Sequence, residues 1–132
     1  MERKTAEEIV EYYMEIPGMM NLLRQEKEKI ERKRNEEPEA YCRIAEIDVN
    51  MQVLERDEVS IRSCIDGLNS KYKKLILLRS GNRYSWGGVA ARVGLPESTA
   101  RDWHKKACRK LGDMMEEIPM IEELVYRASR AR

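Results

Sequence analysis

The sequence predicts an all-α protein in which a long, coiled-coil-like N-terminal helical hairpin precedes a bundle of shorter helices and a short C-terminal helix. Three observations lead to this prediction. Glycine and proline are sparse, at seven and four residues in 132, and few segments are β-branched enough for strands. Apolar residues recur at gaps of three and four, the spacing of one helix face. Charged residues make up 37% of the chain and phenylalanine is absent, which suits extended helices better than a thick globular core.

The first helical segment covers about residues 6–34 and carries a heptad seam, the pattern of helices that pair in coiled coils. The seam is interrupted by one lysine and comprises Ile9, Tyr13, Ile16, Met20, Leu23, Lys27 and Ile30. Proline inside a helix removes a backbone hydrogen bond and clashes with the preceding turn. Because Pro17 and Gly18 interrupt the segment, we expect two helices, near 5–15 and 18–34, that meet at a kink.

A second seam follows a turn at Asn35–Pro38 and predicts a helix from about 38 to 67. It comprises Ile44, Ile47, Met51, Leu54, Glu58, Ile61, Ile65 and Leu68. Glu58 is out of place in an apolar seam, so we expect a bend there, with Val59 taking its position. Long amphipathic helices need a partner to cover their apolar stripe. We therefore expect residues 1–67 to fold as an antiparallel hairpin that also self-associates, with a dimer favoured; a purely intramolecular core is the alternative.

The next helix is expected from Leu68 to about Arg79, with apolar residues spaced for one buried face. A polar turn follows at Ser80–Arg83, and Asn82 is the residue in it that tolerates left-handed geometry. Ser85 is then a natural N-cap for a further helix, because its hydroxyl can accept from a free backbone N–H.

Two short helices joined by a tight turn complete a domain at residues 68–112. Gly94 lies where the chain turns sharply, with positive φ, and Pro96 fits the first turn of the following helix. The apolar stripes that face each other comprise Val89, Ala90, Val93, Leu95, Ala100, Trp103 or His104, Ala107 and Leu111. This is the pattern of a helix-turn-helix whose second helix enters the major groove of DNA.

The segment from Ser85 to Ala100 reads SWGGVAARVGLPESTA and, with the helix before it, resembles region 4 of the sigma-70 family. The end of the motif resembles phage regulators of the ArpU and RinA type, at Thr99, Ala100, His104, Ala107 and Leu111. Gly87 and Gly88 depart from the pattern, because they replace good helix formers at about 1 kcal/mol each. The resemblance implies a phage or prophage transcription regulator that activates late or packaging genes, and it allows RNA polymerase as a further partner.

Charge is distributed unevenly along the chain. Residues 71–111 hold eleven basic and two acidic side chains, a net charge of +9, whereas residues 1–70 carry −6 and residues 112–132 carry −2. The basic block coincides with the helix-turn-helix, where attraction to phosphate is needed. We therefore expect double-stranded DNA as the partner.

The docking rule for this motif assigns roles by position. Early residues of the second helix meet base edges, so we expect base contacts from Pro96, Glu97, Ser98, Arg101, Asp102 and Lys105. Arg101 suits guanine O6 and N7; Glu97 suits either cytosine N4 or the positive end of its own helix. Phosphate contacts are expected from Lys71, Lys73, Arg83, Thr99, Lys106 and Arg109.

Several functions find little support in the sequence. The chain has one histidine and no glycine-rich loop after a strand, so we expect neither an enzyme nor a cofactor. His104 and Cys108 stand four apart but lack a second ligand pair, so we expect no metal. No run of about 18 apolar residues and no apolar signal-peptide core is present, which predicts no membrane span and a cytoplasmic location in a bacterial host cell. The three cysteines are then reduced thiols.

Residues 113–132 are expected to form a last amphipathic helix from Pro119 and a frayed tail from Ser129. Other functions remain open for the whole chain. One is a small terminase subunit that recognises a DNA packaging site, and another is a sigma factor-like subunit that binds RNA polymerase. A third is an interaction protein, such as an anti-repressor, that has lost DNA binding.

Overall fold

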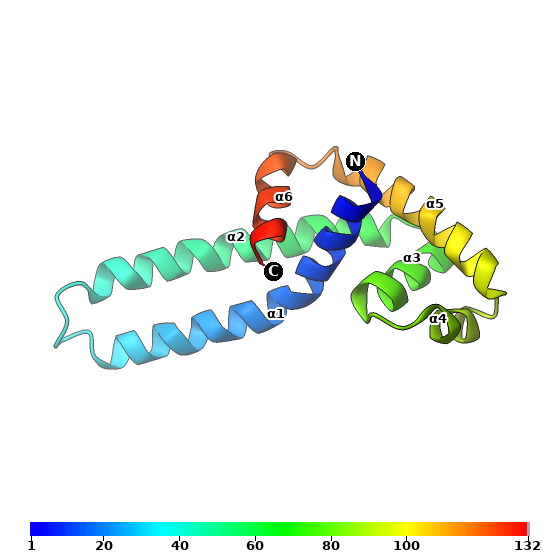
Figure 1. Cartoon of the computed structure of the whole chain (residues 1–132). Helices are drawn as coiled ribbons and strands as arrows, with labels where there is room; N and C mark the ends of the chain where they lie inside the picture. Colours follow the sequence, from blue (N-terminus) through cyan, green and yellow to red (C-terminus); the bar gives the residue numbers. More distant parts are fainter. Residues whose placement is uncertain (132) are drawn as a thin grey trace. The chain divides into compact units, whose positions relative to one another are not determined.

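The computed structural model describes residues 1–131, which form six α-helices, one π-helical segment and no strand. The predicted all-α class is therefore confirmed. The chain divides into two compact units: unit 1 is Met1–Met14 together with Ser60–Arg132, and unit 2 is Glu15–Val59. Helices α1 (Arg3–Arg32) and α2 (Ala40–Asp66) each contribute residues to both units (Figure 1).

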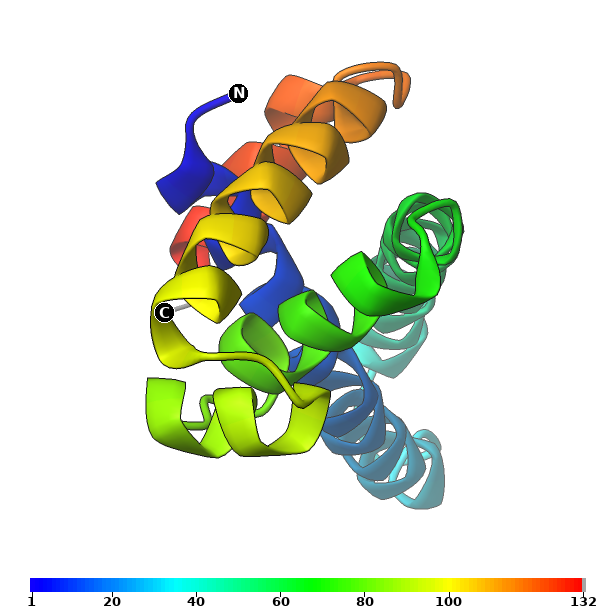
Figure 2. The same cartoon turned by 90° about the vertical axis from the view of Figure 1, so that its right-hand side faces the viewer.

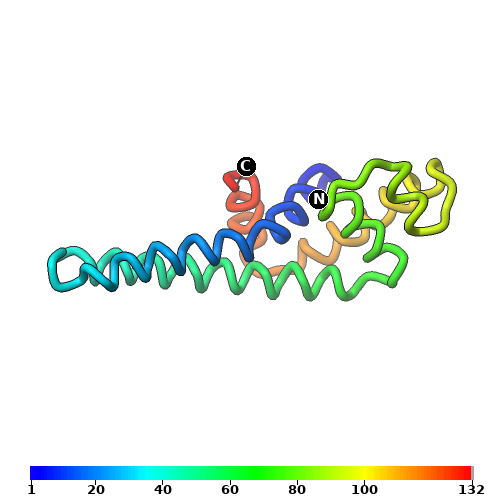
Figure 3. The backbone as a smooth tube through the Cα atoms, turned by 90° about the horizontal axis from the view of Figure 1, so that it is seen from below, coloured from blue at the N-terminus to red at the C-terminus, as the bar shows by residue number. Residues whose placement is uncertain are grey.

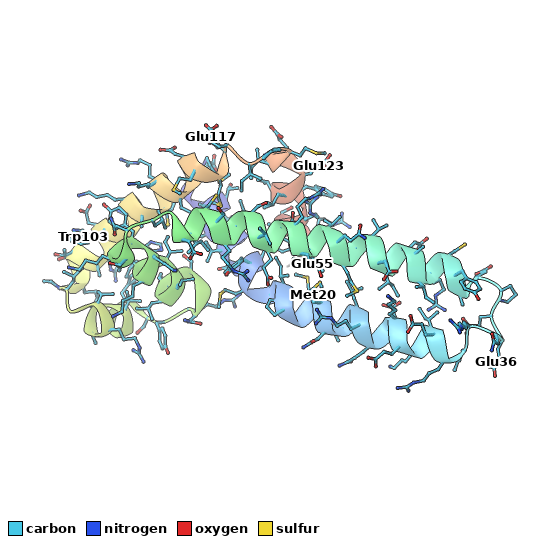
Figure 4. All side chains as sticks on the ribbon, turned by 180° about the vertical axis from the view of Figure 1, so that it is seen from behind. Met20, Glu36, Glu55, Trp103, Glu117 and Glu123 are labelled. Atoms are coloured by element: carbon cyan, nitrogen blue, oxygen red, sulfur yellow. The ribbon has the colours of Figure 1, made fainter. Side chains whose placement is uncertain are left out.

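Unit 2 is a hairpin made by the second part of α1 and the first part of α2 (Figure 3). Its core is a cluster of Ile30, Ala40 and Ile47, against which Leu23, Ile44 and Met51 pack. Lys27, the polar residue of the first seam, forms an ion pair across the hairpin with Asp48 at 2.8 Å. Glu36, labelled in Figure 4, lies in the connection between the helices. Both predicted seams thus supply the residues that pack here.

The expected break at Pro17 is wrong, because α1 is one helix with Pro17 inside it. Proline inside a helix costs about 3 kcal/mol. Pro17 and Gly18 are exposed, whereas Ile16 and Met20 on the adjoining turns are buried, so the apolar face continues unbroken past the proline. Burial of these side chains offsets the lost hydrogen bond.

The second seam also differs from expectation in detail. Helix α2 begins at Ala40, two residues after Pro38, and no break occurs at Glu58. Val59 does not take the place of Glu58, because 60% of its surface is exposed. One residue rotates the side chain by about 100° around a helix, which carries Val59 out of the seam.

In unit 1 the predicted helix 68–79 is divided between two kinds of helix. Helix α3 covers Ser70–Ile76 and is capped by Asn69, whose Oδ1 accepts from the backbone N of Tyr72 at 2.8 Å. A π-helical segment, η1, follows at Leu77–Gly81. Arg83, not Asn82, then adopts left-handed geometry, with φ of 59°. Backbone bonds from Asn82 N to Leu77 O and from Tyr84 N to Leu78 O fix this turn and hold Arg83 there.

Helix α4 (Trp86–Val93) and helix α5 (Glu97–Met115) are joined by a short turn (Figure 2). Ser85 caps α4 as predicted, with its Oγ accepting from Gly88 N at 3.1 Å. Gly94 ends α4 with φ of 68°, also as predicted. Pro96 lies one residue earlier than expected, at the N-cap of α5. A cluster of Leu75, Val89 and Ala100 joins the three helices, with Leu78, Trp86, Ala90, Val93, Leu95 and Trp103 packed around it.

The first turns of α1 and the C-terminal helix complete unit 1. The amino group of Met1 pairs with Glu116, and Arg62 Nε donates to Tyr13 Oη at 3.3 Å. A Cβ on Gly112 would lie 3.3 Å from the Cβ of Met1. Glycine at this position therefore lets the N-terminal residue pack closely against α5.

Helix α6 covers Ile121–Arg130 and buries Leu124 and Ala128. Ser129 and Arg130 are therefore helical rather than frayed, and Ser129 Oγ donates to Tyr126 O at 2.8 Å. Arg132 lies outside the described residues. None of the helices within residues 1–131 combines the length and apolar character that a membrane span requires.

Candidate nucleic-acid interface

Helix α5 has two contrasting faces. Its buried face comprises Ala100, His104, Ala107, Cys108, Leu111, Gly112 and Met115. Its outward face is exposed and comprises Ser98, Asp102, Lys105, Lys106 and Arg109. The sequence left open whether Trp103 or His104 faces inward. His104 is buried, whereas Trp103 is half-buried and packs edge-on against Tyr72, with ring centroids 6.3 Å apart.

The six residues expected to read bases are all exposed and lie at the start and in the first turns of α5: Pro96, Glu97, Ser98, Arg101, Asp102 and Lys105. Two intrahelical ion pairs occur in this stretch. Arg101 Nη2 lies 2.8 Å from Glu97 Oε1, and Lys106 Nζ lies 3.3 Å from Asp102 Oδ2. Exposed pairs of this kind contribute less than about 1 kcal/mol, so a DNA phosphate or base can replace the carboxylate at little cost.

The residues expected to contact phosphate are more varied in their surroundings. Lys106 and Arg109 are exposed on the outward face of α5, and Arg83 is exposed in the turn before α4. Lys71 lies 4.9 Å from the ring centroid of Trp103. Lys73 is already held by Asp66 at 2.6 Å. Thr99 is half-buried, beside the outward face rather than on it.

Two arginines that the sequence did not single out, Arg79 and Arg92, lie on aromatic rings beside these residues. Arg79 lies 4.6 Å from the ring centroid of Trp86, and the predicted Arg101 lies 5.5 Å from the same centroid. Arg79 Nη1 also donates to the backbone carbonyl of Tyr84 at 2.9 Å. Arg92 lies 3.9 Å from the Tyr84 ring. These cation–π contacts hold guanidinium groups in fixed positions at the surface of unit 1.

A cavity of about 510 Å³ opens beside α5, and all of its lining residues belong to unit 1. Five cations line it: Arg3, Arg79, Arg83, Arg101 and Lys105. The carboxylates of Glu7 and Glu11 also line it, so the charged side chains sum to +3. Ser80, Trp86 and His104 form the rest of the wall. The sequence did not predict the lining residues from α1, because no local pattern links Arg3, Glu7 and Glu11 to the lining residues at positions 79–105.

The buried polar pair at the wall of this cavity is Ser80 and His104. Ser80 Oγ and His104 Nε2 lie 3.2 Å apart, so each satisfies a polar atom of the other. Burial, and then the charges of Arg79 and Arg3, lower the pKa of His104 from 6.5 to about 4. The ring is therefore neutral at neutral pH and adds no charge to the cavity.

Three potential metal ligands meet next to this pair. Single donor atoms of Glu7, His104 and Cys108 all lie within 4.8 Å of one another, which supplies the third ligand that the sequence lacked. Burial, and then the charge of Glu7, raise the pKa of Cys108 to about 12. The charges of Arg79 and Arg3, which lower the pKa of His104, oppose a dication here. A structural zinc site takes four protein ligands and the trio supplies three, so the trio fits a packed core better.

Fold and surface together define an all-α protein. Helix α5, the longest of the helices that lie wholly in unit 1, presents a basic outward face. Residues 18–124 match the family described as a protein of unknown function, DUF722, and the chain belongs to that family. No curated protein and no solved structure matches the chain. The resemblance to region 4 of the sigma-70 family and to ArpU and RinA regulators stays a prediction.

Proposed function

We propose that the protein binds double-stranded DNA through the outward face of α5 and regulates transcription. One observation carries the proposal: Lys105, Lys106 and Arg109 are exposed on one side of a helix whose opposite side is buried. An α-helix with its side chains fits the major groove of B-DNA, which is about 12 Å wide. Within residues 1–131 these three side chains stay exposed, so this face can approach a duplex without unfolding.

The turn between α4 and α5 supports the same proposal. In helix-turn-helix proteins the second helix enters the groove with its N-terminal residues at the bases. Gly94 permits the sharp turn, and the cluster around Val89 and Ala100 fixes α4 against α5. Arg101 and Lys105 then follow each other by one turn on the side that would meet base edges. The neighbouring arginines on Trp86 and Tyr84 provide phosphate contacts at the flanks.

We further propose that the protein acts as a homo-oligomer, most simply a dimer. Large apolar side chains of unit 2 are exposed, among them Leu22 at 67%, Val49 at 57% and Val59 at 60%. A second copy that covers such side chains would bring two α5 helices into one assembly, and dimeric helix-turn-helix proteins bind DNA sites made of two half-sites. Mass in solution tests this part: a dimer supports a phage-type regulator, whereas a ring of about eight to twelve copies would favour the alternative of a small terminase subunit with a packaging role.

The DNA-binding test uses the full chain and a random duplex, because phosphate contacts do not depend on sequence. Binding is measured by gel shift at several salt concentrations. Each phosphate contact contributes about −0.9 to the slope of log K against log salt, so Lys106→Ala/Arg109→Ala should flatten the slope by about 2. The matched control is Arg24→Ala/Lys29→Ala, which removes the same charge from exposed positions of unit 2. An equal change in both double variants, or no binding by the unaltered protein at low salt, would overturn the proposal.

A further inference from the structure

We propose that the cavity lined by Arg3, Arg79, Arg83, Arg101 and Lys105 binds a small phosphate-bearing molecule of mononucleotide size, and that this molecule competes with DNA. Binding of the ligand does not depend on the proposed function. Competition with DNA rests on the proposed function, because Arg101 and Lys105 belong both to the cavity and to the expected base-reading residues of α5.

The five cations come from separate stretches of chain. Arg3 lies in the first turn of α1, Arg79 and Arg83 lie in and after η1, and the other two lie on α5. Protein carboxylates offset part of this charge, since Arg3 Nε lies 3.9 Å from Glu7 Oε1 and Arg101 pairs with Glu97. The charged side chains of the lining still sum to +3, which favours an anion in the cavity. A concave wall of one predominant sign also concentrates the field and attracts counter-ions.

The chemistry of the wall suits phosphate. Four of the five cations are arginines, whose planar guanidinium groups bind phosphate or carboxylate oxygens in pairs, and a phosphate group carries more charge to match the +3 lining. Arg79 is held in place by the Tyr84 carbonyl and by the face of Trp86, so part of the site is pre-organised.

The size and remaining walls favour a nucleotide over inorganic phosphate. Ligand sites commonly enclose about 300–1,000 Å³, and this cavity of about 510 Å³ is far larger than one phosphate ion. Glu7 and Glu11 form the wall contributed by α1, where their carboxylates can accept from hydroxyl or amino groups of a ribose or base. Trp86 lines the same cavity, with Arg79 over its ring and its ring centroid 5.2 Å from that of His104.

The first arm of the test is calorimetric titration of the full chain with AMP, GMP and inorganic phosphate at constant ionic strength, with adenosine as the uncharged probe. We expect saturable binding of a nucleotide and none of adenosine. Arg3→Gln should weaken nucleotide binding by about tenfold or more, the loss expected for a charged hydrogen-bonding partner. Lys4→Gln is the matched control, because Lys4 is the exposed neighbour, carries the same charge and does not line the cavity.

Circular dichroism confirms that both variants are folded. The site is refuted if neither nucleotide binds saturably, or if Arg3→Gln and Lys4→Gln weaken binding equally. Binding of inorganic phosphate as tight as that of the nucleotides would refute the assignment of the acidic wall to a ribose or base.

The second arm measures DNA binding with and without the nucleotide. We expect the nucleotide to displace DNA from the unaltered protein but not from Arg3→Gln. Nucleotide binding that leaves DNA affinity unchanged would refute the competition and keep the site. Nucleotide binding by a protein that binds no DNA would refute the proposed function, and with it the competition, but keep the site, so the two failures are distinguishable. Binding of duplex DNA with no nucleotide binding would refute the site and assign its cations to the DNA surface.

Discussion

Acid should destabilise unit 1 through a single buried side chain, His104. Its pKa is about 4 in the folded protein, chiefly because of burial, against 6.5 as the reference value. Between these two values the unfolded chain binds a proton that the folded chain excludes. Stability is therefore complete above about pH 7 and falls as the pH drops towards 4. A difference of about 2.5 pKa units corresponds to about 3 kcal/mol, at 1.36 kcal/mol per unit.

The assay compares the unaltered protein with His104→Gln, which keeps a side chain able to hydrogen-bond to Ser80 but does not titrate. Urea unfolding is followed by far-ultraviolet circular dichroism at about pH 7, 5 and 4. Carboxylates protonate in both proteins, so their effect cancels in the difference between the two free energies of unfolding. Cys108 stays protonated throughout, because its pKa is raised to about 12.

We expect His104→Gln to be the less stable protein at pH 7, because the shape of the buried ring is lost, and the gap to close by about 3 kcal/mol at pH 4. A gap that stays constant across this pH range would refute the reasoning. It would mean that the imidazole is as easily protonated in the folded state as in the unfolded chain.

Three further predictions concern backbone geometry and DNA. Gly94→Ala should destabilise unit 1 by about 1 kcal/mol, because φ is 68° there, and Gly94→Asn by less; chemical denaturation of both variants measures the difference. Ser85→Ala should cost about 1 kcal/mol through loss of the bond from Gly88 N, with Ser85→Asp retaining most of the stability, and similar losses in the two variants would contradict the cap. Arg101→Ala should lower affinity for a selected DNA site by about 1–3 kcal/mol and leave affinity for random DNA less affected. Equal losses on both would reject a base contact by Arg101.

Local chemistry made part of the fold predictable. The Ser85 cap and the Gly94 turn each depend on one residue type with one favoured geometry, and both occur as predicted. The seams also predicted which sides of α1 and α2 pack, because apolar residues at gaps of three and four all lie on one face of a helix. The α-helical class followed from the same period along most of the chain.

Features that depend on neighbours distant in sequence were not predictable. Pro17 favours a helix break locally, and only burial of the flanking turns overrides it. The π-helical segment at Leu77–Gly81 and the left-handed Arg83 have no residue signature of their own. The cavity is the clearest case, since Arg3 joins Arg101 only through tertiary packing. The six residues expected to read bases were predictable as exposed, since the helical period separates the two faces of α5, whereas the half-buried position of Thr99 was not predicted.

The two tryptophans of the chain, Trp86 and Trp103, both belong to unit 1, and residues 15–59 contain none. Indole fluorescence therefore reports on unit 1 alone, and melting of the unit 2 hairpin would leave the emission spectrum unchanged. A heating or denaturant curve recorded by emission and one recorded by total helicity need not coincide, and the gap between them would give the separate stability of the hairpin. Trp86 also lines the cationic cavity, so its quenching offers a label-free signal for whatever enters there.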